Sequence, residues 1–522
     1  MKIVSNPQSC LKGKRLGFSI ALMMVLVFSL TPAMAEIKID VGENPIELTG
    51  SIKQAISYSL EDEDVYDTQS GLQQATFQFI LEADYRPTSD LRFFVSGMLD
   101  VDWAYELLSD DGEWNRKGFD NGRDELFVLD DQEDMLQEFH VTFTPGNWNI
   151  RLGKQIVSWG EMDGLRITDQ INPLDSRRGF TDVQFESIIL PIWLAKVEYF
   201  VPVESGWLYD LGLEFIFNPD VEFRGDEGLG VGNEVGGIWA PGADIDFGDG
   251  FIVHLGSNIE NIHEPSGSDA QEWGFRLKAN VKDSLITLLY FDGISNSPMP
   301  LADFDATIEG LFTDMDISPH DGLPTLHIVY NGTYHDQQYF GATFTRELTK
   351  LSLSALGGQT PVIRLEAAYF LDNIYSDFDE ASLVETDEFF WGIAVDWKVN
   401  IPWINPKSGI YVTPQFFHRK ILDYPARGLA WYPEEDNYTF DLYMETYYLR
   451  SRLTTWFYWA HDFTTEDEFF MAGVSYLYND SWSFSVGWVG VETVKNSLKG
   501  TGYGLETFRH KDHVNFSITY QF

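Results

Sequence analysis

A run of polar residues marks the point where one strand-like segment gives way to a loop. The residues of this run that could do chemistry are Arg151, Gly153, Lys154, Gln155, Trp159, Gly160, Glu161, Asn172, Pro173 and Asp175. Opposite charges can pair there, and Asn172-Pro173 is a turn signal. We expect Glu161 and Asp175 to pair with Arg177 and Arg178 and to hold the loop in a barrel mouth. A strand end with an aromatic anchor and a polar loop is the alternative.

Strand register predicts where the first side chains of this run point. Alternation places Arg151, Gly153 and Gln155 on the lumen face of a barrel. Lys154 then faces lipid, unless a bulge intervenes or its amine reaches the rim. Trp159 is expected at the outer membrane interface, where indole rings are favoured.

Acidic loops and histidines are weaker signals of a metal site or a catalytic site. Asp244, Asp246 and Asp249 are spaced like part of a calcium loop but depart from the order of an EF-hand. An acidic solvated loop is the favoured interpretation, and such loops could bridge through divalent ions to lipopolysaccharide phosphates. No histidine pair has convincing metal-ligand spacing, and no serine lies in a Gly-x-Ser-x-Gly elbow. We expect neither a cofactor nor an enzymatic activity.

Apolar and polar residues alternate along most of the chain, which is the pattern of strands with two different faces. Ala75–Tyr85 shows it, and so does 513–522 at the end of the chain. A membrane barrel turns its apolar face to lipid, whereas a soluble sandwich buries that face. The charged residues expected in the lumen of a barrel are Glu82, Asp84, Asp100, Asp102, Arg276, Lys278, Arg364 and Glu366.

The lengths of the connections favour the membrane barrel. Short turns, such as Pro87–Asp90 and Asn479–Ser481, alternate with long connections near 105–134, 158–188, 218–270, 294–335, 373–386, 421–437 and 493–511. Strands are predicted to begin near residues 47, 73, 91, 135, 148, 189, 207, 271, 284, 336, 361, 387, 408, 438, 450, 467, 481 and 512.

These segments predict an all-β, antiparallel transmembrane barrel of about 18 strands, with 16 as the alternative. Short turns would lie on the periplasmic side and long loops outside. A barrel this wide leaves an aqueous passage, whose width must be set by loops that fold inward.

The first residues predict export. A positive region ending at Arg15, the apolar run Leu16–Leu30 and the small residues Ala33-Met34-Ala35 indicate a cleaved signal peptide over 1–35. Residues 36–522 would then form one outer-membrane barrel domain. The aromatic Phe522 resembles the carboxy-terminal signal that the barrel-assembly machinery reads.

Charge and cysteine content exclude several classes of protein. The net charge is −46, and removal of the signal's four basic residues makes it −50, which argues against binding of nucleic acid. The single cysteine, Cys10, lies in the predicted signal, so disulfides and cysteine-ligated metals are excluded from the mature chain.

The spaced elements Gly153-Lys154-Gln155, Trp159-Gly160-Glu161 and Asn172-Pro173-Leu174-Asp175 resemble the signature of a family of uncharacterised proteobacterial outer-membrane β-barrel proteins, a domain of unknown function. Tyr339–Phe344 followed by Arg364–Tyr369 is a second, weaker match. The resemblance implies a barrel in the outer membrane of a Gram-negative bacterium and a transport role.

The resemblance also implies work beside an inner-membrane exporter of hydrophobic or lipid-like molecules. Outer-membrane lipid and lipopolysaccharide are the other expected contacts. A channel or transporter for a solute is therefore the favoured hypothesis. The alternative is a non-conducting surface scaffold or adhesin, or a barrel that sheathes a partner protein.

Overall fold

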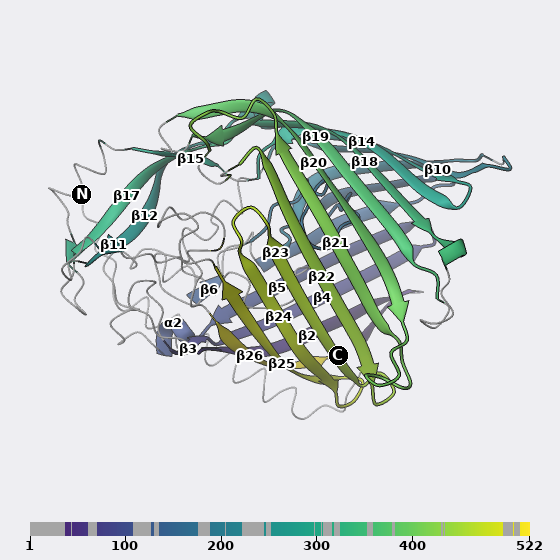
Figure 1. Ribbon diagram of the computed structural model, residues 1–522. Coiled ribbons are helices and arrows are strands. Elements are labelled where there is room, and N and C mark those ends of the chain that lie inside the picture. Colours follow the sequence, from purple (N-terminus) through teal and green to yellow (C-terminus); the bar gives the residue numbers. More distant parts are fainter. Residues whose placement is uncertain are drawn as a thin grey trace.

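The chain folds into a closed antiparallel β-barrel of 18 strands, shown as a computed structural model in Figure 1. The structure describes residues 37–42, 44–60, 70–107, 127–129, 135–175, 188–203, 205–221, 245–246, 252–296, 298–303, 305, 316–317, 324–351, 359–377, 382–429, 432, 434–493, 505 and 512–522.

The barrel strands follow one another around the ring in chain order. They are β2 (Asn44–Ser59), β4 (Thr76–Thr88), β5 (Leu91–Asp102), β7 (Leu136–Phe143), β8 (Trp148–Gln155), β9 (Ile192–Val201), β10 (Leu208–Asn218), β13 (Glu272–Val281), β14 (Ser284–Ile294), β18 (Asp336–Glu347), β19 (Val362–Ser376), β20 (Leu383–Val399), β21 (Ile410–Ile421), β22 (Asp436–Tyr448), β23 (Leu453–Asp462), β24 (Glu468–Leu477), β25 (Trp482–Glu492) and β26 (His513–Gln521).

Shorter elements join this sheet or its connections. They are β1 (Ile37–Val41), β3 (Gly71–Gln74), α2 (Ala104–Leu107), β6 (Val128–Leu129), η5 (Gly267–Ala270) and η6 (Thr349–Leu351). Within the described residues, no helix is long and apolar enough to cross a membrane.

The predicted strand count of 18 is confirmed. Every predicted starting position lies within four residues of the start of a barrel strand. The tight turns 88–91, 281–284 and 477–482 lie at one end of the barrel, and most of the longer connections lie at the other. Period-two alternation is a strong signal here because each strand meets different surroundings on its two faces.

The two faces of the barrel are inverted relative to a soluble protein. Large apolar side chains such as Phe275 and Phe516 lie on the outside, 42% and 50% exposed. Polar side chains such as Arg276, Glu366 and Gln415 are buried inside the ring. Aliphatic and aromatic residues outside and polar residues inside are the arrangement of an outer-membrane barrel, whose outer face is covered by lipid.

β26 closes the ring by pairing with β2 along its whole length, from Ser51 opposite Gln521 to Ser59 opposite His513. At the end of this seam, the backbone of Phe522 exchanges two hydrogen bonds of 3.0 Å with Gly50. A Cβ on Gly50 would lie 2.7 Å from Cζ of Phe522 and 2.6 Å from the carbonyl oxygen of Ile80. The Phe522 ring therefore occupies the space that any larger residue at position 50 would need.

A second sheet, which the sequence analysis missed, lies in the long connections predicted as loops over 218–270 and 294–335. Its strands are β11 (Ile245–Asp246), β12 (Ile252–His263), β15 (Met299–Ala302), β16 (Asp316–Ile317) and β17 (Pro324–Thr333). β12 and β17 pair in parallel, whereas all barrel strands pair antiparallel. Figure 1 shows β11, β12 and β17 running away from the barrel at its long-connection end.

Replacement of Gly50 by alanine should destabilise the seam. Overpacking of this kind costs about 1–3 kcal/mol, so the variant should unfold at a lower denaturant concentration than the wild type. Gly212→Ala on β10 is the matched control, because a Cβ there meets no atom within 4 Å. Unfolding of refolded barrels, followed by the mobility shift of the folded form on gels, measures the difference. Equal midpoints for the two variants would contradict the close fit at Gly50.

Candidate functional site: a loop folded into the lumen

Residues 156–175, which we call the inward loop, follow β8 and fold into the barrel. Trp159 and Ile167 on this loop are 1% and 0% exposed. The loop donates hydrogen bonds to strands far along the ring: Trp159 to Glu214 on β10, Thr168 to Glu366 on β19 and Asp163 to Gln415 on β21. The inward loop therefore lies against the part of the wall that runs from β9 to β22.

An apolar core forms between the inward loop and this wall. The loop contributes Val157, Trp159, Ile167 and Ile171, and the wall contributes Ile192, Leu194, Ile216, Leu289, Phe291, Tyr339, Ala368, Phe370, Phe390 and Phe417. Fully burying one such side chain contributes about 1.5–3 kcal/mol. A cluster of this size keeps the loop against the wall.

Pairs of adjacent aromatic residues on five successive barrel strands build much of this core. The pairs are Tyr290-Phe291, Tyr339-Phe340, Tyr369-Phe370, Phe389-Phe390 and Phe416-Phe417. Successive strand residues face opposite sides, so one ring of each pair points into the barrel. The inward rings lie side by side, with centroids 5.4 Å apart for Phe291 and Tyr339 and 5.0 Å apart for Tyr339 and Phe370. Aromatic residues on the lumen face of neighbouring strands indicate that another segment packs over that face. The sequence analysis did not use this signal.

The carboxylate of Glu366 holds the loop by four hydrogen bonds. Its Oε2 accepts the backbone N–H groups of Glu161 and Met162, at 2.6 and 3.1 Å. Its Oε1 accepts both the N–H and the hydroxyl of Thr168, each at 2.7 Å. Tyr339 donates its hydroxyl to the Thr168 carbonyl at 2.9 Å. An ionised carboxylate is well suited here, because it accepts hydrogen bonds at both oxygens and donates none.

The tip of the loop is held by a second group of polar side chains. Arg364 donates to the Glu161 carbonyl and forms ion pairs with Asp163 and with Asp396 on β20. Gln415 accepts the Asp163 N–H at 3.2 Å. At Gly164 an added Cβ would lie 1.9 Å from a carboxylate oxygen of Asp441, so a larger residue there would displace that side chain.

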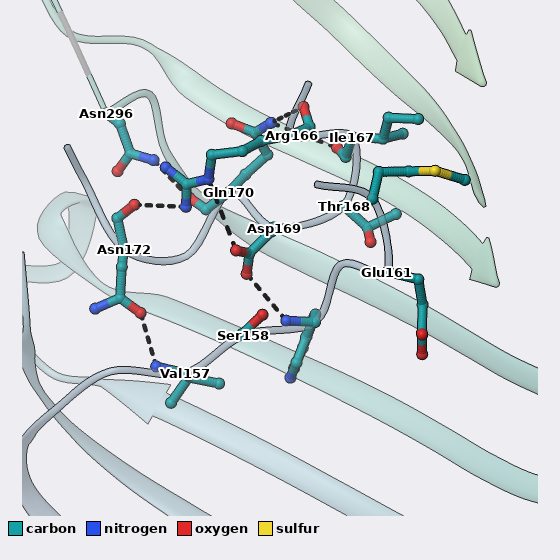
Figure 2. A network of polar contacts seen from close by, with 12 residues as sticks. Val157, Ser158, Glu161, Arg166, Ile167, Thr168, Asp169, Gln170, Asn172 and Asn296 are labelled. Carbon is teal, nitrogen blue, oxygen red and sulfur yellow. Dashed lines mark hydrogen bonds and ion pairs between the residues drawn. The ribbon is translucent and has the colours of Figure 1, made fainter. Parts of the chain in front are cut away.

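Hydrogen bonds within the loop fix its own shape (Figure 2). Asn172 accepts the Val157 N–H at 2.8 Å, and Asp169 accepts the Trp159 N–H at 3.0 Å. Arg166 donates to the Asn172 carbonyl at 2.8 Å and lies 3.7 Å from Asp169. Burial lowers the pKa of the Arg166 guanidinium, and the charge of Asp169 opposes this shift. Asn172, predicted as a turn residue, thus joins the two ends of the loop.

The prediction that Trp159 lies at the outer membrane interface is wrong. Its indole N–H donates to Glu214 at 2.6 Å inside the barrel, and the guanidinium of Arg276 lies 5.4 Å from its ring centroid. Arg276 also pairs with Glu214 at 2.6 Å and donates to the Ser158 carbonyl. The strand ends at Gln155 and the chain then turns inward, so strand register no longer applies at position 159.

Lys154 and Gln155 are both buried, although they are neighbours on one strand. The backbone at Gly153 makes this geometry possible, since its φ of +131° suits only glycine, and a Cβ would lie 2.1 Å from the Phe139 carbonyl oxygen. The Lys154 amine donates to the Leu136 carbonyl at 2.7 Å, and Gln155 donates to the Leu194 carbonyl at 3.0 Å. Lys154 therefore does not face lipid.

The remaining residues of the motif act through their backbone or lie elsewhere. Glu161 contributes its N–H and its carbonyl, and the backbone N–H of Asp175 donates to Ile188 at 2.7 Å. Their predicted ion pairs involve Arg177 and Arg178, which lie outside the described residues. Pro173 accepts a hydrogen bond from Leu190. Gly160 lies where a Cβ would be 2.8 Å from Asp169.

Of the acidic residues considered for calcium, Asp244 and Asp249 lie outside the described residues, and Asp246 ends β11. In the part of the chain that the structure describes, no group of three or more metal-ligating side chains is close enough together to hold a metal ion.

The charged residues predicted for the lumen lie in several different settings. Asp84 pairs with Arg92 at 2.8 Å, and Asp100 accepts a hydrogen bond from Gln78. Asp102 is buried and accepts the N–H groups of Ala75 and Ala104, so it supports the start of α2. Glu82 accepts the Thr49 hydroxyl. Lys278 lies two residues after Arg276, on the same face of β13, and its side chain is half-buried.

A cavity of about 910 Å³ remains in the lumen beside the inward loop. Its wall comes from β2 and from β20 to β26, and Asp163 at the loop tip borders it. Among the described residues, the inward loop thus covers one side of the ring, and the cavity, which we call the hollow side of the lumen, borders β2 and β20 to β26.

A family model described as "Protein of unknown function (DUF1302)" matches residues 18–522. No curated protein matches the chain in sequence.

Among solved structures, the chain is similar to Acinetobacter baumannii OccAB3, with 8% identity, 92% of this chain and 100% of that chain covered, and a TM-score of 0.45. It is similar to Pseudomonas aeruginosa OccK5 (OpdH), with 7% identity, 91% and 97% covered, and a TM-score of 0.45. The Salmonella typhi OmpF complex with daunomycin has 10% identity, 93% and 100% covered, and a TM-score of 0.40.

Replacement of Glu366 by glutamine should loosen the inward loop. In glutamine, an N–H₂ donor replaces one of the two accepting oxygens, so loop N–H groups that were bonded to that oxygen lose their acceptor. Leaving a buried donor without an acceptor costs about 1–3 kcal/mol. The loop should open more often and expose Arg166 to trypsin, so cleavage after Arg166, quantified by mass spectrometry, should rise. Glu82→Gln is the control, because Glu82 accepts from Thr49 on the neighbouring strand β2. Equal cleavage in both variants would show that Glu366 does not hold the loop.

Proposed function

The chain belongs to the DUF1302 family, whose description gives no function, and we propose from the geometry of its lumen that it is an outer-membrane channel that passes a solute. The observation that carries this proposal is the inward loop, fixed against one side of the wall, beside a cavity of about 910 Å³. A barrel of 18 strands is too wide for side chains of its wall to fill. A loop of fixed shape therefore sets the width of the passage.

The packing and hydrogen bonds of the inward loop keep it in place while a solute moves past it. Its apolar side chains face the wall, and the Glu366 and Arg364 side chains hold its backbone. Only its tip, near Asp163, reaches the cavity. A constriction made this way narrows the passage without closing it.

The location and the partners complete the proposal. The apolar outer face suits the outer membrane of a Gram-negative bacterium, where lipid and lipopolysaccharide would surround it and the barrel-assembly machinery would insert it. Export of a hydrophobic or lipid-like solute received from an inner-membrane exporter rests on the family resemblance.

A surface scaffold is the second candidate, and the sheet of β11, β12, β15, β16 and β17 favours it. This sheet extends away from the barrel, where a partner could reach it (Figure 1). Replacement of residues 222–264 by a short linker removes β11 and β12. A channel whose width is set by the inward loop should keep its conductance in this variant, whereas loss of surface binding with no conductance in either form would favour the scaffold.

Narrowing the hollow side of the lumen should lower the conductance. Ser485 on β25 faces the cavity, so Ser485→Trp places an indole in the proposed passage. Phe484→Trp is the matched control, because Phe484 is the adjacent residue on the outer face. Single-channel recordings in planar bilayers should show a smaller current for Ser485→Trp and an unchanged current for Phe484→Trp. A folded wild-type barrel that never conducts in any salt would refute the channel.

A further inference from the structure

One wall of the cavity carries an aromatic platform. Trp456 on β23 lies opposite Gly473 on β24, and Gly473 lies opposite Gly487 on β25. A Cβ on Gly473 would lie 2.3 Å from Cζ2 and 2.5 Å from Cε2 of the indole, so the ring rests directly on the glycine backbone. The glycine lets Trp456 lie close along the wall, where it lines the cavity next to Tyr458.

A strip of hydroxyl groups runs beside this platform. Ser475 and Ser485 share a hydrogen bond of 2.7 Å, and Ser485 lies opposite Ser517 on β26. Two residues further along each strand, Ser483 lies opposite Thr519. Within the described part of the chain, the hydroxyls of Ser483, Ser517 and Thr519 have no side-chain partner, although all three line the cavity. Each can therefore donate to and accept from a solute.

The charged side chains along the cavity already have partners. Asp163 and Asp396 are both paired with Arg364. The Glu445 carboxylate accepts the hydroxyls of Tyr443 and Tyr447, the former at 2.9 Å. Lys53 is also engaged in an interaction. Asp163 and Asp396 share one guanidinium, and the hydroxyls on Glu445 are neutral, so more acidic than basic groups border the cavity and an anionic solute such as a fatty acid is disfavoured.

We propose that the hollow side of the lumen binds neutral, polyhydroxylated solutes of the carbohydrate class, with Trp456 under the apolar face of a sugar ring and the hydroxyls of Ser483, Ser517 and Thr519 bonded to its edge. The proposal rests on the proposed channel function, and it names a different solute class from the hydrophobic or lipid-like one that the family resemblance implies. A pyranose ring has a face of C–H groups and an edge of hydroxyls, and the wall offers a matching surface for each. A long acyl chain would leave the hydroxyl strip without partners, which is unfavourable.

Block of the ion current by sucrose tests the solute class. Two probes serve as comparisons: a polyethylene glycol of similar mass, which has no ring, and octanoate, which is lipid-like and charged. Sucrose should block wild-type channels at a lower concentration than either comparison. Block by sucrose no stronger than by the polyethylene glycol, or stronger block by octanoate, would overturn the proposal and leave the channel standing.

Substitutions of Trp456 test whether sucrose binds at the aromatic platform. Trp456→Ala should raise the half-blocking concentration of sucrose about tenfold, since an aromatic contact is worth about that factor in affinity. Trp456→Phe keeps a ring and should raise it less. Block is expressed relative to each variant's own open current, and Phe484→Trp on the outer face should match the wild type. An unchanged half-blocking concentration in Trp456→Ala would refute the platform.

Equilibrium dialysis of labelled sucrose against the detergent-solubilised barrel separates the two proposals. Binding that is lost in Trp456→Ala would support the carbohydrate site even if the barrel carried no current. Absence of both binding and current would overturn the site and the channel together.

Discussion

The lack of hydrogen-bonding partners in lipid is the constraint from which the rest of this structure follows. Backbone N–H and C=O groups that face hydrocarbon must be satisfied within the protein. A sheet meets this requirement only when it has no edges, and the pairing of β2 with β26 removes the last one. The tight contact of Phe522 with Gly50 lies at the end of that seam, so packing and backbone pairing meet at one place.

Closure of the ring reverses the usual distribution of residues and makes the lumen a polar interior. The inward loop uses this interior in two ways. Its apolar residues find a local core on the aromatic lumen face of β14 to β21, and its backbone donors find acceptors such as Glu366. Burial of a carboxylate is costly unless its oxygens are fully hydrogen-bonded. Glu366 meets that condition through four donors of the loop, so the carboxylate and the loop depend on each other.

The barrel could be predicted from sequence because each strand repeats one simple signal, and the inward loop could not because its contacts are non-local. Period-two alternation located all barrel strands within a few residues. Trp159 was misplaced, since its partner Glu214 is 55 residues away and no local pattern links them. The sheet containing β12 and β17 was missed because its parallel pairing joins two separate connections. The aromatic pair Tyr339-Phe340 and its counterparts broke the alternation, and that irregularity was the available clue to a covered wall.

The position of the inward loop in the chain has a consequence for biogenesis. The loop follows β8, but its docking partners are distributed over β9 to β22. Whichever end of the chain enters the membrane first, the docking surface is complete only when most of the ring has been laid down. The final position of the inward loop is consequently among the last features of the barrel to form.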